Sequence, residues 1–293
     1  MYTNEFEYYA PTTPAEAYEL VSRLGKEAKI LAGGTDLIVL MKDKIVSPPY
    51  LIDIKNIEEF SGIKYEPGKG MEIGATTKIA DIQYSEIVNE KYPVLAYAAS
   101  QLGGPQVRSM STIGGNSCNA SPSAETPPPL VALGATVVLG SAKGEREMPL
   151  EDFIIGVRSI DLREGEILTK FKIPEPSPKS VSFFANAGAR DAMEIDCVNM
   201  AVNLELEDDK QTVKFVKLVQ GSVYIKPLVS RAVPDLLIGK KLTDELIEEA
   251  AEKARSEAKP ISDVRASEWY RYEMVAVLTR QLLKKAFAAA REV

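Results

Sequence analysis

The first fifty residues alternate between helical and extended hydrophobic patterns. Thr13-Pro14-Ala15-Glu16 is typical of a helix start, with a threonine cap, proline at the first helical position and glutamate three residues after the cap. Apolar residues then share one helical face until Gly25, where the helix is predicted to end. Short apolar runs at 28–32 and 50–54 predict strands, and a helical run at 37–41 lies between them. These elements predict a small βαβ lobe over residues 1–56.

The pattern becomes mixed over residues 57–176. Segments 62–66 and 71–75 flank Pro67-Gly68-Lys69-Gly70, which predicts a hairpin. Residues 92–102 predict a helix that ends at Gly103-Gly104, and residues 136–141 and 166–173 predict strands. The prolines at 122 and 127–129 predict an ordered non-helical loop or a helix start.

The remaining residues, 177–293, predict a sheet followed by helices. Strands are expected at 181–185, 198–207 and 212–219, with a turn at Asp208-Asp209-Lys210. Thr243 caps a predicted helix that runs to about residue 258, and Ser267 caps a longer one. The apolar stripe of that last helix favours a buried face over a ligand site. The stripe consists of Tyr272, Val275, Leu278, Leu282 and Ala286. The fold class is therefore α+β, with an α/β N-terminal lobe.

Composition excludes several classes of function. The chain has 293 residues, a net charge of −7 and no basic stripe, so nucleic acid is not an expected partner. Cys118 and Cys197 are too few to hold an iron–sulfur cluster or a structural zinc. The chain contains no histidine, which excludes Ser-His-Asp and Cys-His mechanisms. Redox chemistry on this chain would therefore need a bound organic cofactor.

The hydropathy of the chain predicts a cytoplasmic protein. No apolar run is long enough to span a bilayer. The N-terminal residues Met1-Tyr2-Thr3-Asn4-Glu5 lack the basic head and apolar core of a secretory signal.

Two glycine pairs, 81 positions apart, are the strongest chemical signal. The first is Ala32-Gly33-Gly34-Thr35-Asp36, placed between a predicted strand and a predicted helix. Glycine permits close approach and positive φ, both of which a diphosphate bound by main-chain N–H groups requires. Thr35 can cap the helix and donate to a phosphate oxygen. A plain strand-to-helix turn is the alternative interpretation. The spacing matches neither the dinucleotide fingerprint G-x-G-x-x-G nor a P-loop.

The second pair, Thr112-Ile113-Gly114-Gly115-Asn116, is also expected to form a turn. It opens a run of small polar residues that continues to Ser123, and Glu125 is the only acid between Glu90 and Glu145. A carboxylate suits the vicinal hydroxyls of a ribose or ribityl chain, which donate to it. A solvated loop is the alternative, although the three consecutive prolines favour a fixed shape. Two such turns predict a dinucleotide-like cofactor that is bound from two sides.

These segments, in this order, resemble the FAD-binding medium subunit of molybdenum-containing hydroxylases, the xanthine dehydrogenase and carbon monoxide dehydrogenase family. The resemblance spans nearly the whole chain. Its pieces are Ile30 to Leu37, Gln106-Val107-Arg108 with Thr112 to Asn116, Asn119-Ala120-Ser121-Pro122, Glu166-Ile167-Leu168 before Ile173-Pro174, Arg190 to Ile195, and Arg265-Ala266-Ser267 with Tyr270-Arg271.

The resemblance implies an FAD-binding fold of the vanillyl-alcohol-oxidase (PCMH) type, with a C-terminal lobe of sheet plus helices. It divides the chain into lobes 1–56, 57–176 and 177–293 and places the diphosphate between the two glycine segments. The first segment that it implies is Ile30, Leu31, Ala32, Gly33, Gly34, Thr35, Asp36 and Leu37, and the second is Thr112, Ile113, Gly114, Gly115 and Asn116.

Four further positions follow from the resemblance alone. Leu102 stands near the adenine side, where animal members have an aromatic residue, and Glu125 stands where the family usually has aspartate. Leu168 matches a backbone contact to the flavin edge. Asn186 falls where many relatives have a lysine near the flavin. Lysine would stabilise negative charge on a reduced flavin, so asparagine predicts a lower flavin potential or a different acceptor.

The resemblance also implies which subunit of the complex carries out each step. A large molybdopterin-binding subunit oxidises substrate, a small subunit carries [2Fe-2S] clusters, and FAD on this chain passes electrons to NAD⁺ or another acceptor. None of the binding residues of this chain needs to be a catalytic acid or base. Arg190-Asp191 is implied to lie near the flavin face, whereas Trp269, Tyr270 and Tyr272 are expected in the core or a subunit interface. A stand-alone flavoenzyme of the same fold and a non-catalytic nucleotide-binding or assembly module are the alternatives.

Overall fold

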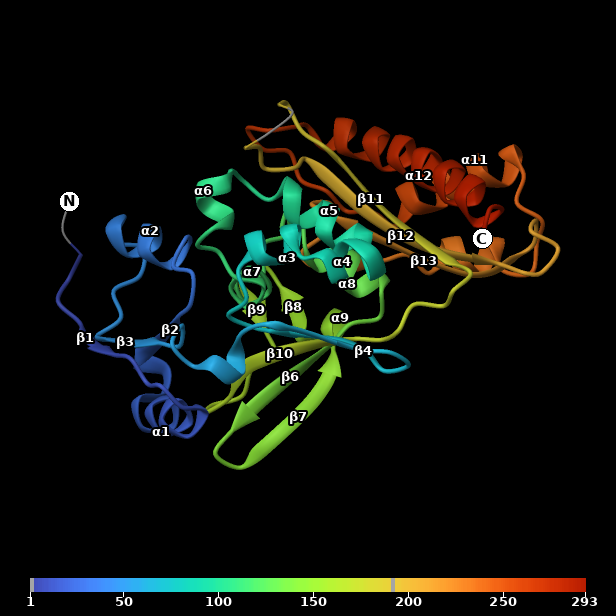
Figure 1. Ribbon diagram of the computed structural model, residues 1–293. Helices are drawn as coiled ribbons and strands as arrows, with labels where there is room; N and C mark the ends of the chain where they lie inside the picture. The colour runs from blue at the N-terminus through green and yellow to red at the C-terminus, as the bar shows by residue number, and fades with distance from the viewer. Residues whose placement is uncertain (1–2, 191–192) are drawn as a thin grey trace.

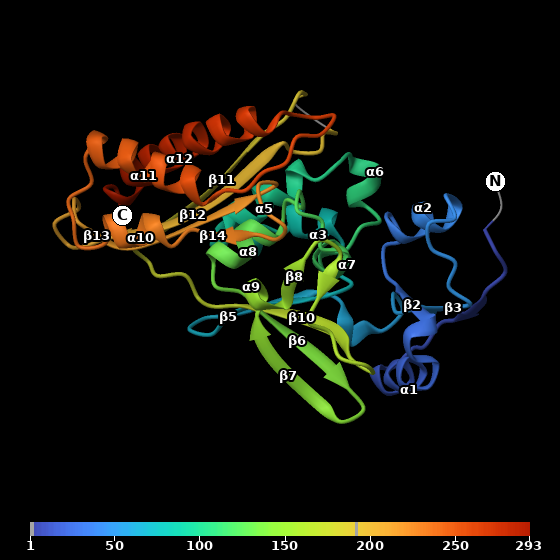
Figure 2. The same ribbon diagram turned by 180° about the vertical axis from the view of Figure 1, so that it is seen from behind.

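The computed structural model describes residues 3–190 and 193–293, so Asp191, which the family resemblance places near the flavin face together with Arg190, lies outside it. Figures 1 and 2 show the three larger sheets in chain order, each accompanied by its own helices; a fourth sheet, of two short strands, belongs to the second lobe. Among the described residues, no helix has the length and apolar character needed to cross a bilayer.

The N-terminal lobe is a three-stranded parallel sheet in the order β1-β3-β2. Thr13 caps its first helix as expected, since its side chain accepts from the Glu16 N–H, and Gly25 ends that helix at φ 55°. The first strand was not among the predicted elements, because three partly exposed residues carry little pattern. The elements are β1 (Glu7–Tyr9), α1 (Pro14–Leu24), β2 (Ala28–Leu31), α2 (Leu37–Lys42) and β3 (Tyr50–Asp53).

The second lobe has a five-stranded antiparallel sheet in the order β4-β5-β10-β6-β7. The expected hairpin, the helix before Gly103, and both expected strands are present. The proline run begins a helix, and all three of its prolines are buried. The strands are β4 (Ile63–Glu66), β5 (Gly70–Gly74), β6 (Thr136–Ser141), β7 (Gly144–Pro149), β8 (Ile154–Gly156), β9 (Ser159–Ile160) and β10 (Ile167–Ile173). The helices are α3 (Ile79–Tyr84), α4 (Glu86–Lys91), α5 (Pro93–Gln101), α6 (Pro105–Arg108), α7 (Ile113–Asn119), α8 (Pro127–Ala132) and α9 (Leu150–Phe153).

The C-terminal lobe is a four-stranded antiparallel sheet covered on one face by two long helices (Figure 1). Thr243 and Ser267 cap these helices as predicted. The stripe on the last helix packs into the core of this lobe. The elements are β11 (Ser180–Ala187), β12 (Val198–Leu206), β13 (Val213–Gly221), β14 (Leu228–Val229), α10 (Ala232–Leu237), α11 (Asp244–Glu257) and α12 (Glu268–Ala290).

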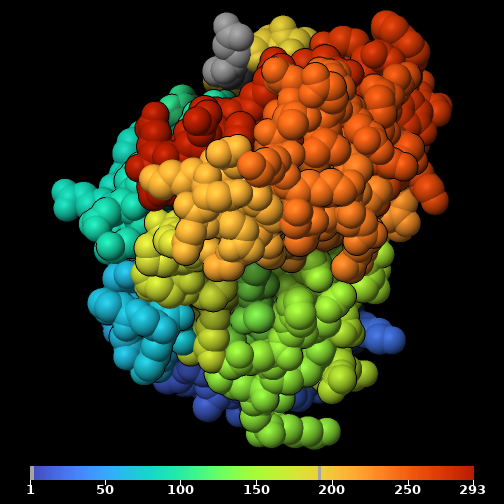
Figure 3. Space-filling model, turned by 90° about the vertical axis from the view of Figure 1, so that its right-hand side faces the viewer, coloured from blue at the N-terminus to red at the C-terminus, as the bar shows by residue number. Residues whose placement is uncertain are grey.

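The second and C-terminal lobes share a core. Phe184, Ala201 and Val219 of the C-terminal sheet pack into the hydrophobic cluster of the second lobe. The face of that sheet opposite α12 therefore rests on α5 and α8. Figure 3 shows the C-terminal lobe seated on the second lobe, with most of the first lobe behind.

Two local predictions were wrong. The segment from Thr112 to Asn116 is not a turn: Ile113 begins α7, and Thr112 caps it by accepting from the Gly115 N–H at 3.1 Å. Glycine disfavours helices by about 1 kcal/mol, so the pattern pointed away from this outcome. Thr35 is not the cap of α2, because the cap position is Asp36 and no side chain caps that helix.

Candidate functional site

A cleft of about 890 Å³ opens between the first and second lobes. This volume is within the range of about 300–1,000 Å³ that is usual for sites of small ligands and cofactors. One wall comes from residues 28–40 of the first lobe, and the other from α7 and the segment 158–168 of the second. Every candidate residue lines this cleft except Leu31, Ile113, Glu125 and Asn186.

The first glycine segment lies against the backbone that leads into the second one, although 81 positions separate the two glycine pairs in the chain. A Cβ added to Gly33 would lie 2.3 Å from the Met110 carbonyl oxygen and 2.8 Å from the Ser111 Cα. Asn119, at the end of α7, donates to the Asp36 carboxylate at 3.1 Å. Only a residue without a side chain allows this backbone approach.

The first segment carries an uninterrupted run of free backbone donors. Among the described residues, none accepts a hydrogen bond from the N–H of Gly33, Gly34, Thr35, Asp36 or Leu37. Gly34 has φ 73°, which turns the chain between β2 and α2. Successive free N–H groups around such a turn form a concavity that binds anions. The fit to a diphosphate is therefore good at this segment.

The second segment has a different structure. Its four N–H groups from Ile113 to Asn116 already have acceptors within the protein: the Thr77 and Ala75 carbonyls, the Thr112 hydroxyl and the Thr112 carbonyl. Gly114 packs so closely that a Cβ would lie 2.6 Å from the Ala75 oxygen. The segment thus contributes bare glycine surface to the cleft rather than free donors.

Three side chains in or next to the second segment still have hydrogen-bonding groups without a partner among the described residues. The Ser111 hydroxyl is buried without a hydrogen-bond partner among the described residues and lines the cleft. Asn116 accepts from the Thr126 hydroxyl at 2.6 Å, which leaves its amide N–H groups available. The Thr112 hydroxyl accepts from Gly115 and keeps its own proton to donate.

Leu31 and Ile113 are buried and do not line the cleft. Leu102 and Leu168 supply apolar surface to the cleft wall.

Glu125 and Asn186 do not line the cleft. Glu125 is 8 % exposed, and burial, with a smaller contribution from the charge of Asp196, raises its pKa to about 8. Asn186 donates to the Asp196 carboxylate at 2.8 Å. Burial raises the pKa of Asp196 to about 6, although its hydrogen bonds from Asn186 and Asn199 oppose the shift.

Several cleft residues were not predicted from the sequence. Lys29 and Arg158 bring positive charge to the cleft wall, and Arg158 adopts φ 53°, which is uncommon for a residue other than glycine. A lysine in the strand that leads into the glycine segment was the available signal for Lys29. Asp196 was also missed, and its signal was an acid between Ile195 and Cys197 directly before a buried strand.

Trp269 and Tyr270 are exposed, and neither lines the cleft, whereas Tyr272 packs on the C-terminal core.

Comparison with known proteins agrees with this geometry. The family model described as "FAD binding domain in molybdopterin dehydrogenase" matches residues 4–176, and "CO dehydrogenase flavoprotein C-terminal domain" matches residues 183–286. The glyceraldehyde dehydrogenase medium chain of Sulfolobus acidocaldarius is 35% identical, over 97% of this chain and 99% of that one. The carbon monoxide dehydrogenase medium chain of Hydrogenophaga pseudoflava is 31% identical, over 97% of each.

Solved structures show the same similarity. A chain of carbon monoxide dehydrogenase from Hydrogenophaga pseudoflava has a TM-score of 0.94 at 31% identity, covering 98% of this chain and 99% of that one. A chain of quinoline 2-oxidoreductase from Pseudomonas putida 86 has a TM-score of 0.92 at 26% identity, covering 99% and 100%.

Proposed function

Because the chain belongs to the family of FAD-binding medium subunits of molybdenum hydroxylases, we propose that it holds FAD in the cleft between its first two lobes and relays electrons. The relay runs from iron–sulfur clusters on a small partner subunit to NAD⁺ or another acceptor. Substrate is oxidised at the molybdenum cofactor of a large partner subunit. A cytoplasmic location is part of the same proposal.

The observation that carries this proposal is the run of free N–H groups from Gly33 to Leu37, which begins where Gly33 packs on the backbone of Met110 and Ser111, just before the second glycine segment. A diphosphate is the linker of FAD, and main-chain donors hold it without a counter-charge of their own. Lys29 and Arg158 add positive charge at the same cleft. The Ser111 hydroxyl, buried without a partner, gains one from a polar ligand.

Bound FAD supplies two-electron chemistry at this site; the protein binds and orients it and excludes water. Leu102 and Leu168 give the apolar contact that a ring system needs. Thr35, Thr112 and Asn116 supply hydroxyl and amide donors to phosphate and ribityl oxygens.

The direct test is purification of the chain with and without its neighbouring subunits. We expect a yellow protein, and release of its nucleotide by denaturation should give FAD rather than FMN. Chains bearing molybdenum and iron–sulfur cofactors should co-purify with it. A colourless protein that binds FAD with a Kd weaker than about 1 mM, or about −4 kcal/mol, would remove the proposal.

The acceptor is tested separately, by mixing the reduced complex with NAD⁺ and following reoxidation of the flavin. Rapid reoxidation supports NAD⁺; no reoxidation by NAD⁺ but rapid reoxidation by a quinone or dye assigns another acceptor. A yellow chain that purifies alone and turns over a small molecule would favour the stand-alone flavoenzyme.

A further inference from the structure

Two buried carboxyl groups, Glu125 and Asp196, lie near the contact between the second and C-terminal lobes, close enough for the charge of Asp196 to act on Glu125. The loop that carries Glu125 rests on the residues around Asp196. Ser222 donates its N–H to the Pro122 carbonyl at 2.7 Å and its hydroxyl to the Asp196 carbonyl at 3.1 Å. Asn199 donates to the Asp196 carboxylate at 3.1 Å and to the Ser123 carbonyl at 3.4 Å.

Neither carboxyl group has a cation partner. Among residues 3–190 and 193–293, no ion pair involves Glu125 or Asp196; the donors to Asp196 are the neutral amides of Asn186 and Asn199. The charges that act on the two groups are themselves negative: Asp196 and Asp36 on Glu125, and Glu194 on Asp196.

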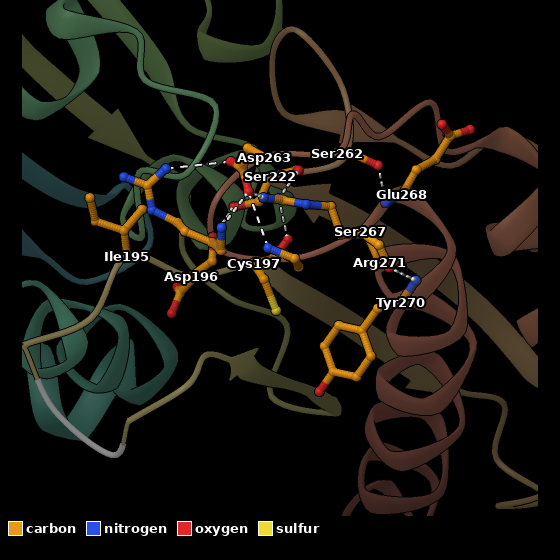
Figure 4. Close-up of polar contacts among 12 residues, drawn as sticks. Ile195, Asp196, Cys197, Ser222, Ser262, Asp263, Ser267, Glu268, Tyr270 and Arg271 are labelled. Atoms are coloured by element: carbon orange, nitrogen blue, oxygen red, sulfur yellow. Dashed lines mark hydrogen bonds and ion pairs between the residues drawn. The ribbon is translucent and has the colours of Figure 1, made fainter.

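Arg271 lies in the same region but is engaged elsewhere. Its guanidinium donates to the Cys197 carbonyl at 2.6 Å, the Ser222 carbonyl at 2.9 Å and the Asp263 carboxylate at 2.8 Å. Figure 4 shows the Asp196 carboxylate pointing away from this guanidinium. Arg271 therefore fixes the backbone on either side of the pair without neutralising it.

A third buried carboxyl group shows the contrast. Glu205 on β12 is 8 % exposed, the same fraction as Glu125, but Lys214 donates to it at 2.7 Å. The hydrogen bond from Lys214 lowers the pKa of Glu205. Burial is the largest cause of the pKa shift at Glu125 but only the second at Glu205, so the cation and a weaker desolvation together keep Glu205 ionised.

The pair is connected to the cleft. Thr126 follows Glu125 in the chain and donates to Asn116, which lines the cleft. Asp36, whose charge acts on Glu125, lines the same cleft. Glu125 is therefore connected to the cleft wall through its neighbour Thr126.

We propose that Glu125 and Asp196 together hold one exchangeable proton that compensates negative charge arriving in the cleft. This inference rests on the proposed function. The pair takes one proton from water when two electrons arrive from the partner's iron–sulfur clusters, and returns it when they leave for the acceptor. The pair makes and breaks no bond to the cofactor. The proton that it takes from water offsets one of the two negative charges that arrive in the cleft, and the other remains on the cofactor.

The titration behaviour of the two groups is consistent with this role. Burial is the largest cause of both shifts, and it brings the pKa of Glu125 to about 8 and that of Asp196 to about 6. Coupled carboxyl groups titrate as a pair, so near pH 7 the resting pair carries about one proton and has one ionised carboxylate left that can take up a second. A negative charge nearby raises such pKa values further and draws in a proton.

The test measures the flavin midpoint potential of the FAD-loaded complex as a function of pH. The range runs from about pH 6 to about pH 8.5, which brackets the pKa values expected for the pair. The wild type should show a slope steeper than that of the double variant Glu125→Gln, Asp196→Asn. One proton for two electrons adds up to about 30 mV per pH unit, the tenfold equivalent for a two-electron couple. The matched control Glu205→Gln should keep the wild-type slope.

Asn186→Lys places a fixed cation beside Asp196. It should raise the midpoint, as the resemblance to the family predicts for a lysine at this position, and flatten the slope as the double variant does. An unchanged midpoint would discard the prediction made for Asn186.

A second readout needs neither cofactor nor activity. Carbon-13 NMR of the carboxyl groups in the apoprotein should show Glu125 titrating well above Glu205. If the double variant fails to fold, the single variant Glu125→Gln replaces it and should also flatten the slope, whereas Glu125→Asp keeps an ionisable group and should keep the slope.

The outcomes separate the two proposals. If both proteins bind FAD and the flavin midpoint potential has the same pH slope in the wild type and in the double variant, the proton-holding pair is overturned. The proposed function is then unaffected. A Glu125 that titrates with an ordinary pKa in the apoprotein also overturns the proton-holding pair. A protein that binds no FAD overturns the proposed function first.

Discussion

The two glycine segments look alike in sequence and differ in structure. The segment at Gly33-Gly34 is a turn whose five successive N–H groups have no acceptor among the described residues. The segment at Gly114-Gly115 lies in α7, and its N–H groups from Ile113 to Asn116 have acceptors within the protein. The first glycines expose backbone donors to a ligand, and the second allow a helix to pack against Ala75. A glycine pair thus indicates a place where another group lies close to the backbone. Whether that group is a ligand or another part of the protein depends on which backbone N–H groups are free.

The largest effect is expected from Gly33→Ala. The new Cβ would meet the Met110 oxygen at 2.3 Å, so the two segments must separate. We expect destabilisation of about 1–3 kcal/mol. FAD affinity should fall about 100-fold or more, where each 1.4 kcal/mol is tenfold. Thermal unfolding and flavin titration measure the two losses.

Gly156→Ala is the control for Gly33→Ala. Its Cβ would have no neighbour closer than 3.9 Å, so stability and FAD affinity should stay near wild type. Equal behaviour of the two variants would contradict the close contact between the segments.

Gly114→Ala should act mainly on stability. Its Cβ would lie 2.6 Å from the Ala75 oxygen, which forces α7 to shift at a cost of about 1–3 kcal/mol. Gly115→Ala would bring its Cβ to 2.9 Å from the Thr112 hydroxyl, so that side chain must shift, and this cost offsets a gain of up to about 1 kcal/mol in helix propensity. Urea unfolding should therefore show a large loss for position 114 and little change for 115. The reverse order would show that α7 does not pack as described.

Thr112→Val removes the cap of α7. The loss of this hydrogen bond should cost about 1 kcal/mol and weaken FAD binding several-fold, because the segment no longer holds its position in the cleft. Thr243→Val removes the equivalent cap from α11, outside the cleft, and should lose similar stability while FAD affinity is retained. Calorimetry measures the stability of the two variants, and flavin titration measures their FAD affinity. Equal FAD affinities would show that Thr112 does not position the segment for FAD.

Asn119→Ala gives the smallest change. It removes one exposed hydrogen bond, to Asp36 at 3.1 Å, worth at most about 1 kcal/mol. FAD affinity should fall no more than about five-fold, as fluorescence titration can measure. A much larger loss would mean that this bond, rather than the Gly33 contact, holds the segments together.

The sequence predicted the elements whose signals are local. Thr13, Thr243 and Ser267 each cap a helix as expected, because a cap depends on neighbouring residues alone. Strand β6 was predicted with its observed bounds, and β10, β12 and β13 within two residues, since their apolar runs are buried.

What the sequence missed depends on tertiary contacts. Helix α7 contains two glycines and forms because Gly114 packs on Ala75 and Thr112 caps it. Strand β7 is an edge strand with a polar sequence, so it has no apolar run to predict it. The pairing of Glu125 with Asp196 joins residues 71 positions apart across two lobes, which no local pattern encodes. The family resemblance placed most of the cleft residues together, but it did not indicate which of their N–H groups are free.

The most direct test of this account is amide hydrogen exchange by NMR on the apoprotein and on the FAD-saturated protein. The N–H groups of Gly33 to Leu37 should exchange rapidly in the apoprotein and become protected at least about tenfold when FAD binds, because they gain phosphate acceptors. Those from Ile113 to Asn116 should be protected in both states. Protection of the first group without FAD, or protection gained on binding by the second group alone, would contradict the claim that the first segment holds the diphosphate.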